Sequence, residues 1–258
     1  MNNINKFFDV KDKVAVITGG GGYLCGEMAR SLSSCGSKVI ILDKSIDKAK
    51  KVVQNIKKNN GNSECLYLDS TDKNSFIECY TFIKKKYKKI DILINGAGVN
   101  APTDFFKITE KEFNDIISSH LKGTMFGCQV FGKNMIENKK GSIINMSSAS
   151  SGPPLSKAFI YSAAKSGIKN LTQNLAREFA IHKVRVNSLR PGFFPTTWSK
   201  KHFIDKKRKK SILSHTPMKR FGTPKELVGA VIWLSSDSSS FVTGAEIPVD
   251  GGFTSMTI

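Results

Sequence analysis

The segment YSAAK places a tyrosine and a lysine four residues apart, at Tyr161 and Lys165. On a helix this spacing puts the two side chains on the same face, one turn apart. An ammonium group near a phenol stabilises the phenolate and lowers a pKa that is about 10 when unperturbed. We therefore expect Tyr161 to remove a proton from an alcohol, or to return one to a carbonyl, near neutral pH.

A serine hydroxyl precedes this pair. The apolar segment GSIINMSS ends at Ser148, 13 residues before Tyr161. A hydroxyl at the end of a strand can bond to a substrate oxygen and stabilise the negative charge that develops there. Because Tyr-x-x-x-Lys alone is common on surface helices, the prediction of a catalytic set also needs Ser148 and a cofactor loop.

A candidate loop lies near the start of the chain, where TGGGGYLCG (18–26) follows the apolar run VAVI and precedes a helical pattern. A strand, a glycine turn and a helix form the context in which backbone N–H groups and the positive end of a helix dipole bind phosphates. A turn without a ligand is the alternative. The residues predicted to contact a cofactor here are Thr18, Gly19, Gly22, Tyr23 and Leu24.

Acidic residues end the next two apolar runs. Asp43 ends KVIILD, where a carboxylate can accept hydrogen bonds from the adenosine ribose. It would repel a 2′-phosphate, so the sequence favours NAD over NADP, although Lys44 weakens this preference. Asp69 ends ECLYLD and could bind the adenine amino group; capping a helix is its alternative role.

The elements that must position these residues alternate along the chain. Continuous apolar runs are typical of parallel strands covered on both faces, and helical patterns lie between them. We predict one α/β domain spanning residues 1–258, a Rossmann-type doubly wound parallel sheet of about seven strands flanked by helices. Thr109 and Glu112 (TEKE) predict a capping box that opens a long helix toward Asn138. The predicted strands are 14–18, 38–43, 64–69, 90–95, 141–148, 184–189 and 245–250.

Composition excludes several classes of protein. No stretch approaches the roughly 18 apolar residues that span a bilayer, and MNNINKFFDVKDK lacks the layout of a signal peptide. The five cysteines are scattered, which favours free thiols in a cytoplasmic protein and no metal site. The net charge of +19 comes almost entirely from dispersed lysines, so we expect a solvated surface, then steering of an anionic small molecule, and no nucleic-acid partner.

Together these segments resemble the short-chain dehydrogenase/reductase family in its compact single-domain form, over nearly the whole chain. The matching segments are the glycine loop, NGAG (95–98), NMSS, YSAAK, RVNSLRPGFFPT and VTGAEIPVDGGF. The resemblance implies hydride transfer with NAD and a catalytic set of Ser148, Tyr161 and Lys165. Its implied cofactor contacts are Asn95, Gly96 and Ala97 near the adenosine ribose, Tyr161 and Lys165 at the nicotinamide ribose, and Pro191, Gly192, Phe194 and Thr196 at the carboxamide.

The loop departs from the family pattern Thr-Gly-x-x-x-Gly-x-Gly, since Tyr23 and Cys25 replace its last two glycines. It is similar to a sub-branch with Thr-Gly-Gly-Gly-Gly-x-Leu that binds dinucleotide and includes mannonate and fructuronate oxidoreductases. We therefore expect a functional loop in which Gly26, one residue after the last glycine of the family pattern, supplies the close packing.

A second departure falls on the long helix, where the family usually has Asn-x-x-Gly and this chain has HLKG. The family asparagine supports a water-borne proton relay to the lysine. His120 could be a buried structural residue, could hold or titrate within the relay, or could lower activity.

The segment 193–222 resembles the family's mobile substrate lid, and here it is strongly basic. Most of its charges are expected to face solvent, but one or two could bind a carboxylate or phosphate. Arg190, just before the Pro-Gly turn, is a further candidate. The basic residues in the lid are Lys200, Lys201, His202, Lys206, Lys207, Arg208, Lys209, Lys210 and His215.

The leading hypothesis is an NAD-dependent oxidoreductase that interconverts a secondary alcohol and a ketone on a sugar, sugar acid, sugar phosphate or nucleotide sugar. Such reactions serve uronate metabolism or the biosynthesis of surface sugars. The alternatives are a 3-oxoacyl reductase, which Asp43 disfavours, a sugar epimerase or dehydratase, and a non-enzymatic nucleotide-binding module. The resemblance further implies a homotetramer or homodimer.

Overall fold

Seven strands form one sheet in a computed structural model that describes residues 4–256. The strand order is β3-β2-β1-β4-β5-β6-β7, and every neighbouring pair is parallel. The predicted fold class is therefore confirmed. The strands are β1 (Val14–Thr18), β2 (Lys38–Asp43), β3 (Ser63–Tyr67), β4 (Ile92–Asn95), β5 (Gly141–Met146), β6 (Val184–Pro191) and β7 (Glu246–Val249).

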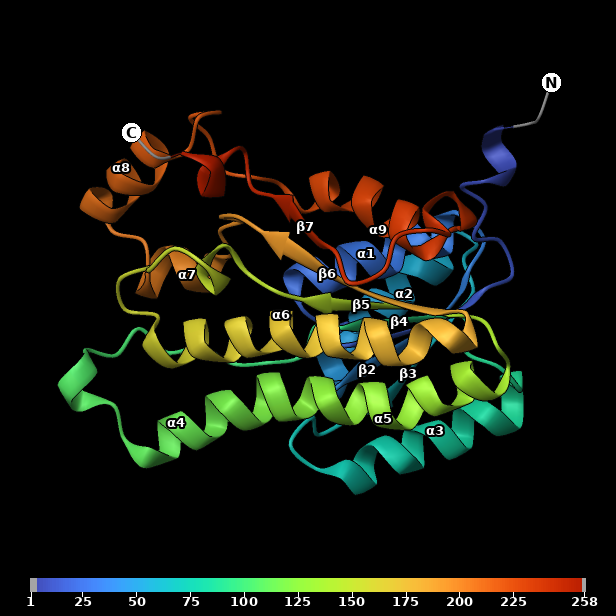
Figure 1. Cartoon of the computed structure of the whole chain (residues 1–258). Coiled ribbons are helices and arrows are strands. Elements are labelled where there is room, and N and C mark those ends of the chain that lie inside the picture. The colour runs from blue at the N-terminus through green and yellow to red at the C-terminus, as the bar shows by residue number, and fades with distance from the viewer. Residues whose placement is uncertain (1–3, 257–258) are drawn as a thin grey trace.

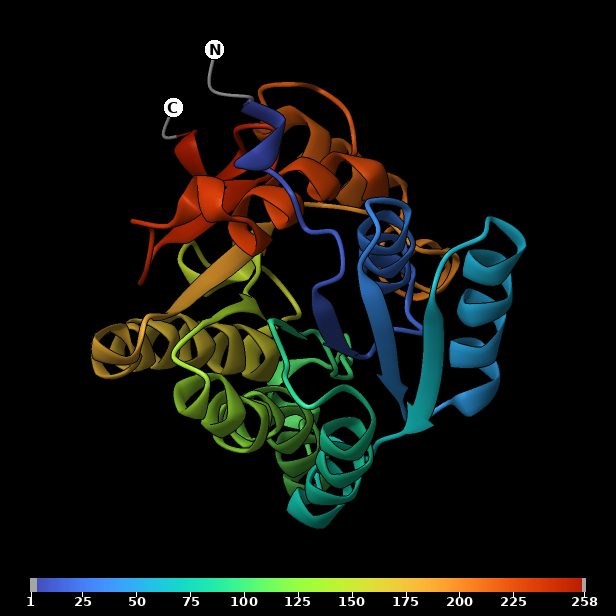
Figure 2. The ribbon, with the colours of Figure 1, turned by 90° about the vertical axis from the view of Figure 1, so that its right-hand side faces the viewer.

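Helices cover both faces of the sheet (Figure 1). One apolar cluster joins the strands to α1, α2 and α9, and a second joins them to α3, α5 and α6. Figure 2 shows these two layers on opposite sides of the strands. The helices are α1 (Tyr23–Ser34), α2 (Ile46–Lys58), α3 (Lys73–Tyr87), α4 (Glu110–Ile117), α5 (Gly123–Glu137), α6 (Phe159–Phe179), α7 (Thr197–His202), α8 (Lys206–His215) and α9 (Val228–Ser235).

Within residues 4–256, none of the helices is both long enough and apolar enough to cross a bilayer. The central strands β1 and β4 are, by contrast, largely apolar. All residues of β1 and β4 are buried, because helices cover both faces of these central strands.

The predicted long helix is interrupted. Residues Ser118–Lys122 form a π-helical segment between α4 and α5, and Asn138 ends α5. Thr109 caps α4 by accepting a hydrogen bond from the Glu112 N–H at 3.1 Å. The Glu112 carboxylate instead accepts from the Thr103 hydroxyl at 2.6 Å, so only half of the predicted capping box forms. A π-helical turn inside a helix often marks a functional position.

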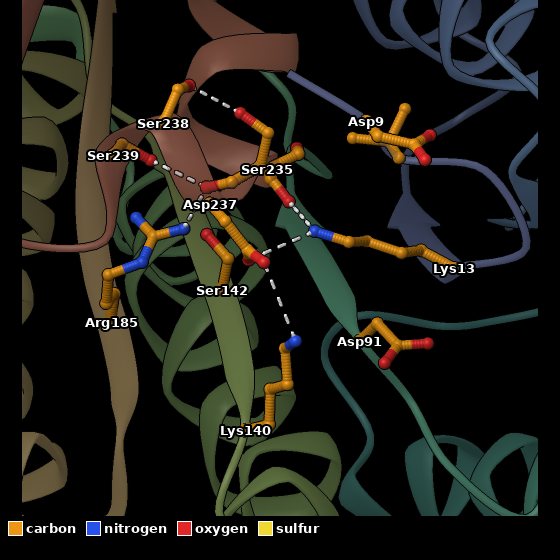
Figure 3. A network of polar contacts seen from close by, with 12 residues as sticks. Asp9, Lys13, Asp91, Lys140, Ser142, Arg185, Ser235, Asp237, Ser238 and Ser239 are labelled. Carbon is orange, nitrogen blue, oxygen red and sulfur yellow. Dashed lines mark hydrogen bonds and ion pairs between the residues drawn. The ribbon is translucent and has the colours of Figure 1, made fainter. Parts of the chain in front are cut away.

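A polar network ties the amino-terminal edge of the sheet to the end of α9 (Figure 3). Lys13 donates to the Ser235 carbonyl at 2.9 Å, and both Lys13 and Lys140 lie within 4 Å of Asp237. Arg185 donates to two carbonyls at the end of α9. A cavity of about 650 Å³ lies at this edge, but it contains none of the predicted site residues. The candidate chemistry lies at the opposite edge.

Candidate active site

Two adjoining cavities open at the carboxyl edge of the sheet, where the chain order reverses between β1 and β4. In doubly wound sheets this reversal is where ligands bind. The larger cavity has a volume of about 940 Å³ and the smaller about 350 Å³. They share the lining residues Gly19, Gly22, Gly96, Gly98 and Val99, so together they form one long crevice.

The glycine loop forms the floor between the two cavities. Gly19 has a φ of +67°, and a Cβ there would lie 2.8 Å from the Ala97 Cα, so only glycine fits. Helix α1 begins at Tyr23, and its N-cap residue, Gly22, has no side chain that could bond to the first amides. The first turn of a helix leaves its N–H groups without helical partners. These amides and the helix dipole suit an anionic phosphate at this position.

The two unusual loop residues leave the crevice open. Tyr23 is 51% exposed at the rim of the smaller cavity. Cys25 points inward, and a Cβ on Gly96 would lie only 2.2 Å from its Sγ atom. Burial raises the pKa of Cys25 to about 12, so this thiol is an inert packing group. Gly26 packs closely as expected, since a Cβ there would lie 3.3 Å from the Gly20 carbonyl oxygen.

Asp43 lies at the rim of the larger cavity. Its Oδ2 accepts from the Gly21 N–H at 2.9 Å, and its Oδ1 accepts from the Ser45 N–H at 2.8 Å. These two bonds join the carboxylate to both the glycine loop and the start of α2. A ribose hydroxyl at this rim would find an acceptor that is already fixed in place.

Asp69 lines the same cavity. It accepts from the Lys44 ammonium at 2.7 Å and from the Thr71 hydroxyl and N–H. The bond from Lys44 is the main reason that the pKa of Asp69 lies at about 2. Asp72 caps α3, so the alternative that Asp69 is the helix cap is wrong.

Two predicted cofactor residues lie behind the cavity wall. The Thr18 hydroxyl is buried and accepts from the N–H groups of Gly96 and Ala97, which themselves line the larger cavity. Asn95 lines neither cavity, because its side chain turns into the protein and donates to the Asn145 Oδ1 at 2.9 Å. In the structure, Thr18 and Asn95 therefore stabilise the wall of the crevice from behind and do not line it.

The four predicted catalytic residues line the smaller cavity together. Tyr161 and Lys165 lie one turn apart on α6, and Tyr161 is near enough to Ser148 for the serine hydroxyl to oppose the rise in the Tyr161 pKa. Ser148 follows β5 and also accepts from the Ser150 N–H at 3.2 Å. The Lys165 Nζ atom donates to the Met146 carbonyl at 2.6 Å and lies 5.5 Å from the centre of the Tyr161 ring.

The electrostatics of Tyr161 differ from the prediction. Burial raises the pKa of Tyr161, and the Ser148 hydroxyl only partly opposes this. The predicted net lowering of this pKa beside Lys165 is therefore wrong, because burial of the phenol is the dominant influence. Burial also lowers the pKa of Lys165 to about 8. At neutral pH Tyr161 therefore carries its proton, which is the form that can protonate a carbonyl oxygen.

His120 occupies the π-helical segment and is 5% exposed. Its Nε2 atom lies 2.8 Å from the Val99 carbonyl oxygen, while its Nδ1 atom is buried without a partner. Because a carbonyl only accepts, the proton belongs on Nε2 and Nδ1 is left as an acceptor. The imidazole packs edge-on against the Tyr161 ring, with 5.2 Å between ring centres. Burial, aided by the charge of Lys165, lowers the pKa of His120 well below 6.5, so the ring is neutral.

The far wall of the smaller cavity comes from the end of β6. The Gly192 N–H donates to the Val249 carbonyl at 3.0 Å, and a Cβ on Gly192 would lie 2.6 Å from the Asp250 Cα. Thr196 uses its hydroxyl to cap α7, accepting from the Ser199 N–H at 3.0 Å. The predicted residues that this wall brings to the cavity are Pro191, Gly192, Phe194 and Thr196.

The lid contains α7 and α8. The lysines of the lid, among them the candidate Lys200, are exposed and line neither cavity. Arg208 instead turns inward, stacks 4.2 Å above the Phe203 ring, and donates to the Ser156 hydroxyl at 2.8 Å. The suggestion that Arg190 faces the substrate is wrong, because Arg190 is 3.1 Å from the Glu246 carboxylate and lines neither cavity.

Sequence reasoning missed two residues that shape the crevice, Gly98 and Val99. A Cβ on Gly98 would lie 1.9 Å from the His120 Cε1 atom, so the imidazole fits only because this residue is glycine. The signal was available, since Gly98 is the last residue of the NGAG segment. Val99 gave no signal, because it contributes its backbone carbonyl to His120 rather than its side chain.

Comparisons with known proteins agree with this geometry. Residues 24–254 match the family described as enoyl-(acyl carrier protein) reductase. The chain is 40% identical to an uncharacterised oxidoreductase called UxuB from Bacillus subtilis, with 93% of this chain and 94% of the relative covered.

Two solved structures are similar over the full chain. A gluconate 5-dehydrogenase from Burkholderia cenocepacia in complex with NADP and tartrate is 26% identical, with a TM-score of 0.94 and coverage of 99% of this chain and 100% of the other. A Haemophilus influenza protein provisionally called a D-mannonate oxidoreductase, with bound NAD, is 31% identical, with a TM-score of 0.90 and coverage of 99% of both chains.

Proposed function

The chain belongs to the short-chain dehydrogenase/reductase family, whose members act on CH–OH groups, and we propose that it is an NAD-dependent oxidoreductase acting on a sugar acid or a related sugar. The reaction interconverts a secondary alcohol and a ketone. One observation carries the proposal: Ser148, Tyr161 and Lys165 line a cavity that continues, across the glycine loop, into a second cavity with Asp43 at its rim.

The crevice fits a dinucleotide on structural grounds. The uncapped start of α1 suits the pyrophosphate, and Asp43 offers ribose hydroxyls a fixed acceptor. Asp69 is the candidate partner for the adenine amino group, and the end of β6 encloses the opposite end of the crevice. When bound there, the nicotinamide ring supplies or accepts the hydride.

The side chains of the smaller cavity handle the proton. The Tyr161 hydroxyl donates its proton to the substrate carbonyl oxygen during reduction and takes it back from the alcohol during oxidation. Ser148 bonds to the same oxygen and stabilises its developing charge. Lys165 is charged below about pH 8 and favours negative charge on the neighbouring Tyr161 oxygen as the proton leaves.

His120 supports this set as a neutral acceptor. Its Nδ1 atom is buried without a partner in the wall of the cavity that holds Tyr161 and Lys165. We assign it a hydrogen bond from a water that connects Lys165 to the outside, which is the role expected of asparagine in the family. The lowered pKa of His120 argues against titration within this relay at neutral pH.

The proposed substrate is a sugar acid because a relative of known structure is named a gluconate 5-dehydrogenase and because the lid directs a cation inward. Arg208 lines a cavity of about 320 Å³ between α8 and the segment 153–156, which follows the Ser148 loop. A guanidinium at this position can bind a carboxylate through two parallel hydrogen bonds. A preference for NAD rests on Asp43.

We further propose that the whole chain acts as one domain with a lid at 193–222, in the cytoplasm, as a homotetramer or homodimer. All five cysteines are free, as a reducing compartment would require. Phe113 on α4 and Phe159 on α6 are each 44% exposed, and Phe106 is 98% exposed. Exposed aromatic side chains of this kind are typical of surfaces that associate.

The test is a screen of sugars, sugar acids and sugar phosphates with NAD⁺ or NADH, followed by absorbance of the reduced nicotinamide. Tyr161→Phe should lower turnover of the best substrate at least about 100-fold, because it removes the acid/base, and should leave NADH affinity within a few fold. Tyr80→Phe is the control, since Tyr80 on α3 packs against Phe131 and lines neither cavity. Turnover retained by Tyr161→Phe would refute the assignment.

A further inference from the structure

A mostly buried ion pair between Glu246 and Arg190 lies behind the loop that carries Ser148. Glu246 on β7 and Arg190 on β6 have side chains that are only 11% and 12% exposed. The Glu246 Oε2 atom is 3.1 Å from Arg190 Nη1 and 3.4 Å from Lys169 Nζ. Burying such a pair removes both charges from water, and an apolar pair of similar volume is often as stable. Stability alone is therefore a poor reason for this arrangement.

The second oxygen of the carboxylate is directed to the active-site loop. Glu246 Oε1 accepts from the Ser147 hydroxyl at 2.7 Å and from the Ser151 hydroxyl at 2.9 Å. These serines lie on either side of Ser148, one residue before it and three residues after it. One oxygen of the Glu246 carboxylate thus contacts both ends of the short turn that contains Ser148.

Arg190 reaches the middle of the same turn. Its Nη2 atom donates to the Ala149 carbonyl at 3.4 Å, and a Cβ on Gly152 would lie 2.7 Å from that nitrogen. The backbone is further fixed by the Ser147 N–H, which donates to the Leu189 carbonyl at 2.8 Å. Side chains from β6 and β7 therefore hold the turn from behind, while the Ser148 hydroxyl faces Tyr161.

We propose that Glu246 is a positioning residue for Ser148, acting through the Ser147 and Ser151 hydroxyls and held in place by its ion pairs with Arg190 and Lys169. This inference rests on the proposed function for its kinetic consequence. Glu246 touches neither cavity, so its effect falls on the orientation of the Ser148 hydroxyl and not on cofactor binding. A displacement of about 1 Å in a catalytic group can cost up to about 100-fold in rate.

Glu246→Gln is the informative variant, because it keeps the size of the side chain and removes its charge. The amide oxygen accepts more weakly than a carboxylate, and Arg190 and Lys169 lose their counter-ion. We expect kcat to fall about tenfold while the Kd for NADH stays within about twofold. Glu64→Gln is the matched control. Glu64 lies on β3, at the opposite edge of the sheet, and its partly buried carboxylate is paired with Lys86 on α3.

Two measurements test the proposal. Hydrogen exchange followed by mass spectrometry reports on the amides of residues 147–152 without requiring turnover. Exchange in this segment should be faster in Glu246→Gln than in the wild type and in Glu64→Gln. The second measurement repeats Glu246→Gln in a Ser147→Ala/Ser151→Ala background, where the loss of kcat should disappear, because the hydroxyls that transmit the effect are gone.

Unchanged exchange in residues 147–152 would overturn the proposal, and so would an equal loss of kcat in both backgrounds. If the wild-type protein turned over none of the sugar substrates, the proposed function would fail. Faster exchange confined to residues 147–152 would still support Glu246 as the residue that holds this turn.

Discussion

Asp43 is the residue whose replacement most directly tests cofactor choice. Bonds of 2.9 Å from the Gly21 N–H and 2.8 Å from the Ser45 N–H fix its carboxylate at the rim of the larger cavity. A 2′-phosphate on a bound ribose would bring roughly two negative charges to this rim. The perturbation is Asp43→Asn, which removes the charge and nearly preserves the shape.

The size of the effect follows from the charges at the rim. Two like charges about 4 Å apart repel by about 4 kcal/mol at an effective dielectric constant of about 20. Lys44 and Lys48 line the same cavity, and these cations together with salt reduce the repulsion. We take the net repulsion after this screening as about 2–3 kcal/mol, which corresponds to a change of about 30- to 150-fold in the Kd for NADPH. Asp43→Asn should tighten NADPH binding by this factor and weaken NADH binding about tenfold, because a charge-assisted bond to the ribose is lost.

The assay is fluorescence titration of the wild type and the variant with NADH and NADPH at two salt concentrations. Asp115→Asn is the control, because Asp115 lines the same cavity and its replacement removes the same charge. The Asp115 carboxylate differs from that of Asp43 in being paired with Lys111 at 2.5 Å. The control variant should change the ratio of the two affinities less than about threefold. A wild type that binds NADPH as tightly as NADH would refute the role given to Asp43. An equal switch in Asp115→Asn would show that net charge, and not this carboxylate, sets the preference.

Two further predictions concern the proton and the substrate. Because burial lowers the pKa of Lys165 to about 8, its ammonium is charged below that pH and neutral above it, so ketone reduction should decline as pH rises through about 8. The same rate–pH profile should show no inflection near pH 6.5, since the pKa of His120 lies well below that value; a rate that is constant to pH 10 would contradict the first expectation. Arg208→Ala should raise KM about tenfold for a sugar acid and little for a neutral polyol, whereas Lys207→Ala, at an exposed neighbour, should change neither. Equal increases for both substrates would indicate lost packing on Phe203 instead.

The fold was predictable because several of its strands are continuous apolar runs that alternate with helical patterns. Helices cover both faces of the sheet, so nearly every residue of a central strand is buried and the run has no polar interruption. The ends of these runs also predicted where Asp43 and Ser148 lie, because parallel strands end at one edge. The spacing of Tyr161 and Lys165 predicted that the two side chains share one face of a helix, and both residues do lie on α6.

The direction of individual side chains was less predictable. Asn95 matches a family segment at the end of a strand, yet its side chain is directed to Asn145 and away from the crevice. Arg190 is one residue from the Pro191–Gly192 turn, but its guanidinium pairs with Glu246, 56 residues later. That pair exists because β6 and β7 lie side by side in a particular register, with Arg190 opposite Pro248. No local pattern in the sequence encodes such a register.

His120 shows how the crevice accommodates a departure from the family pattern. An imidazole is larger than a carboxamide, and it occupies the space that a side chain at position 98 would fill. Gly98, which belongs to the family segment NGAG, leaves room for the imidazole, and the Val99 carbonyl, 2.8 Å from Nε2, fixes the Nε2–H tautomer. The result is a buried neutral acceptor beside Tyr161, which is chemically close to an amide oxygen. We predict that His120 supports the relay and that Gly98→Ala would disturb both the site and the local backbone, because the added methyl group would meet the imidazole and the φ of +156° disfavours any side chain.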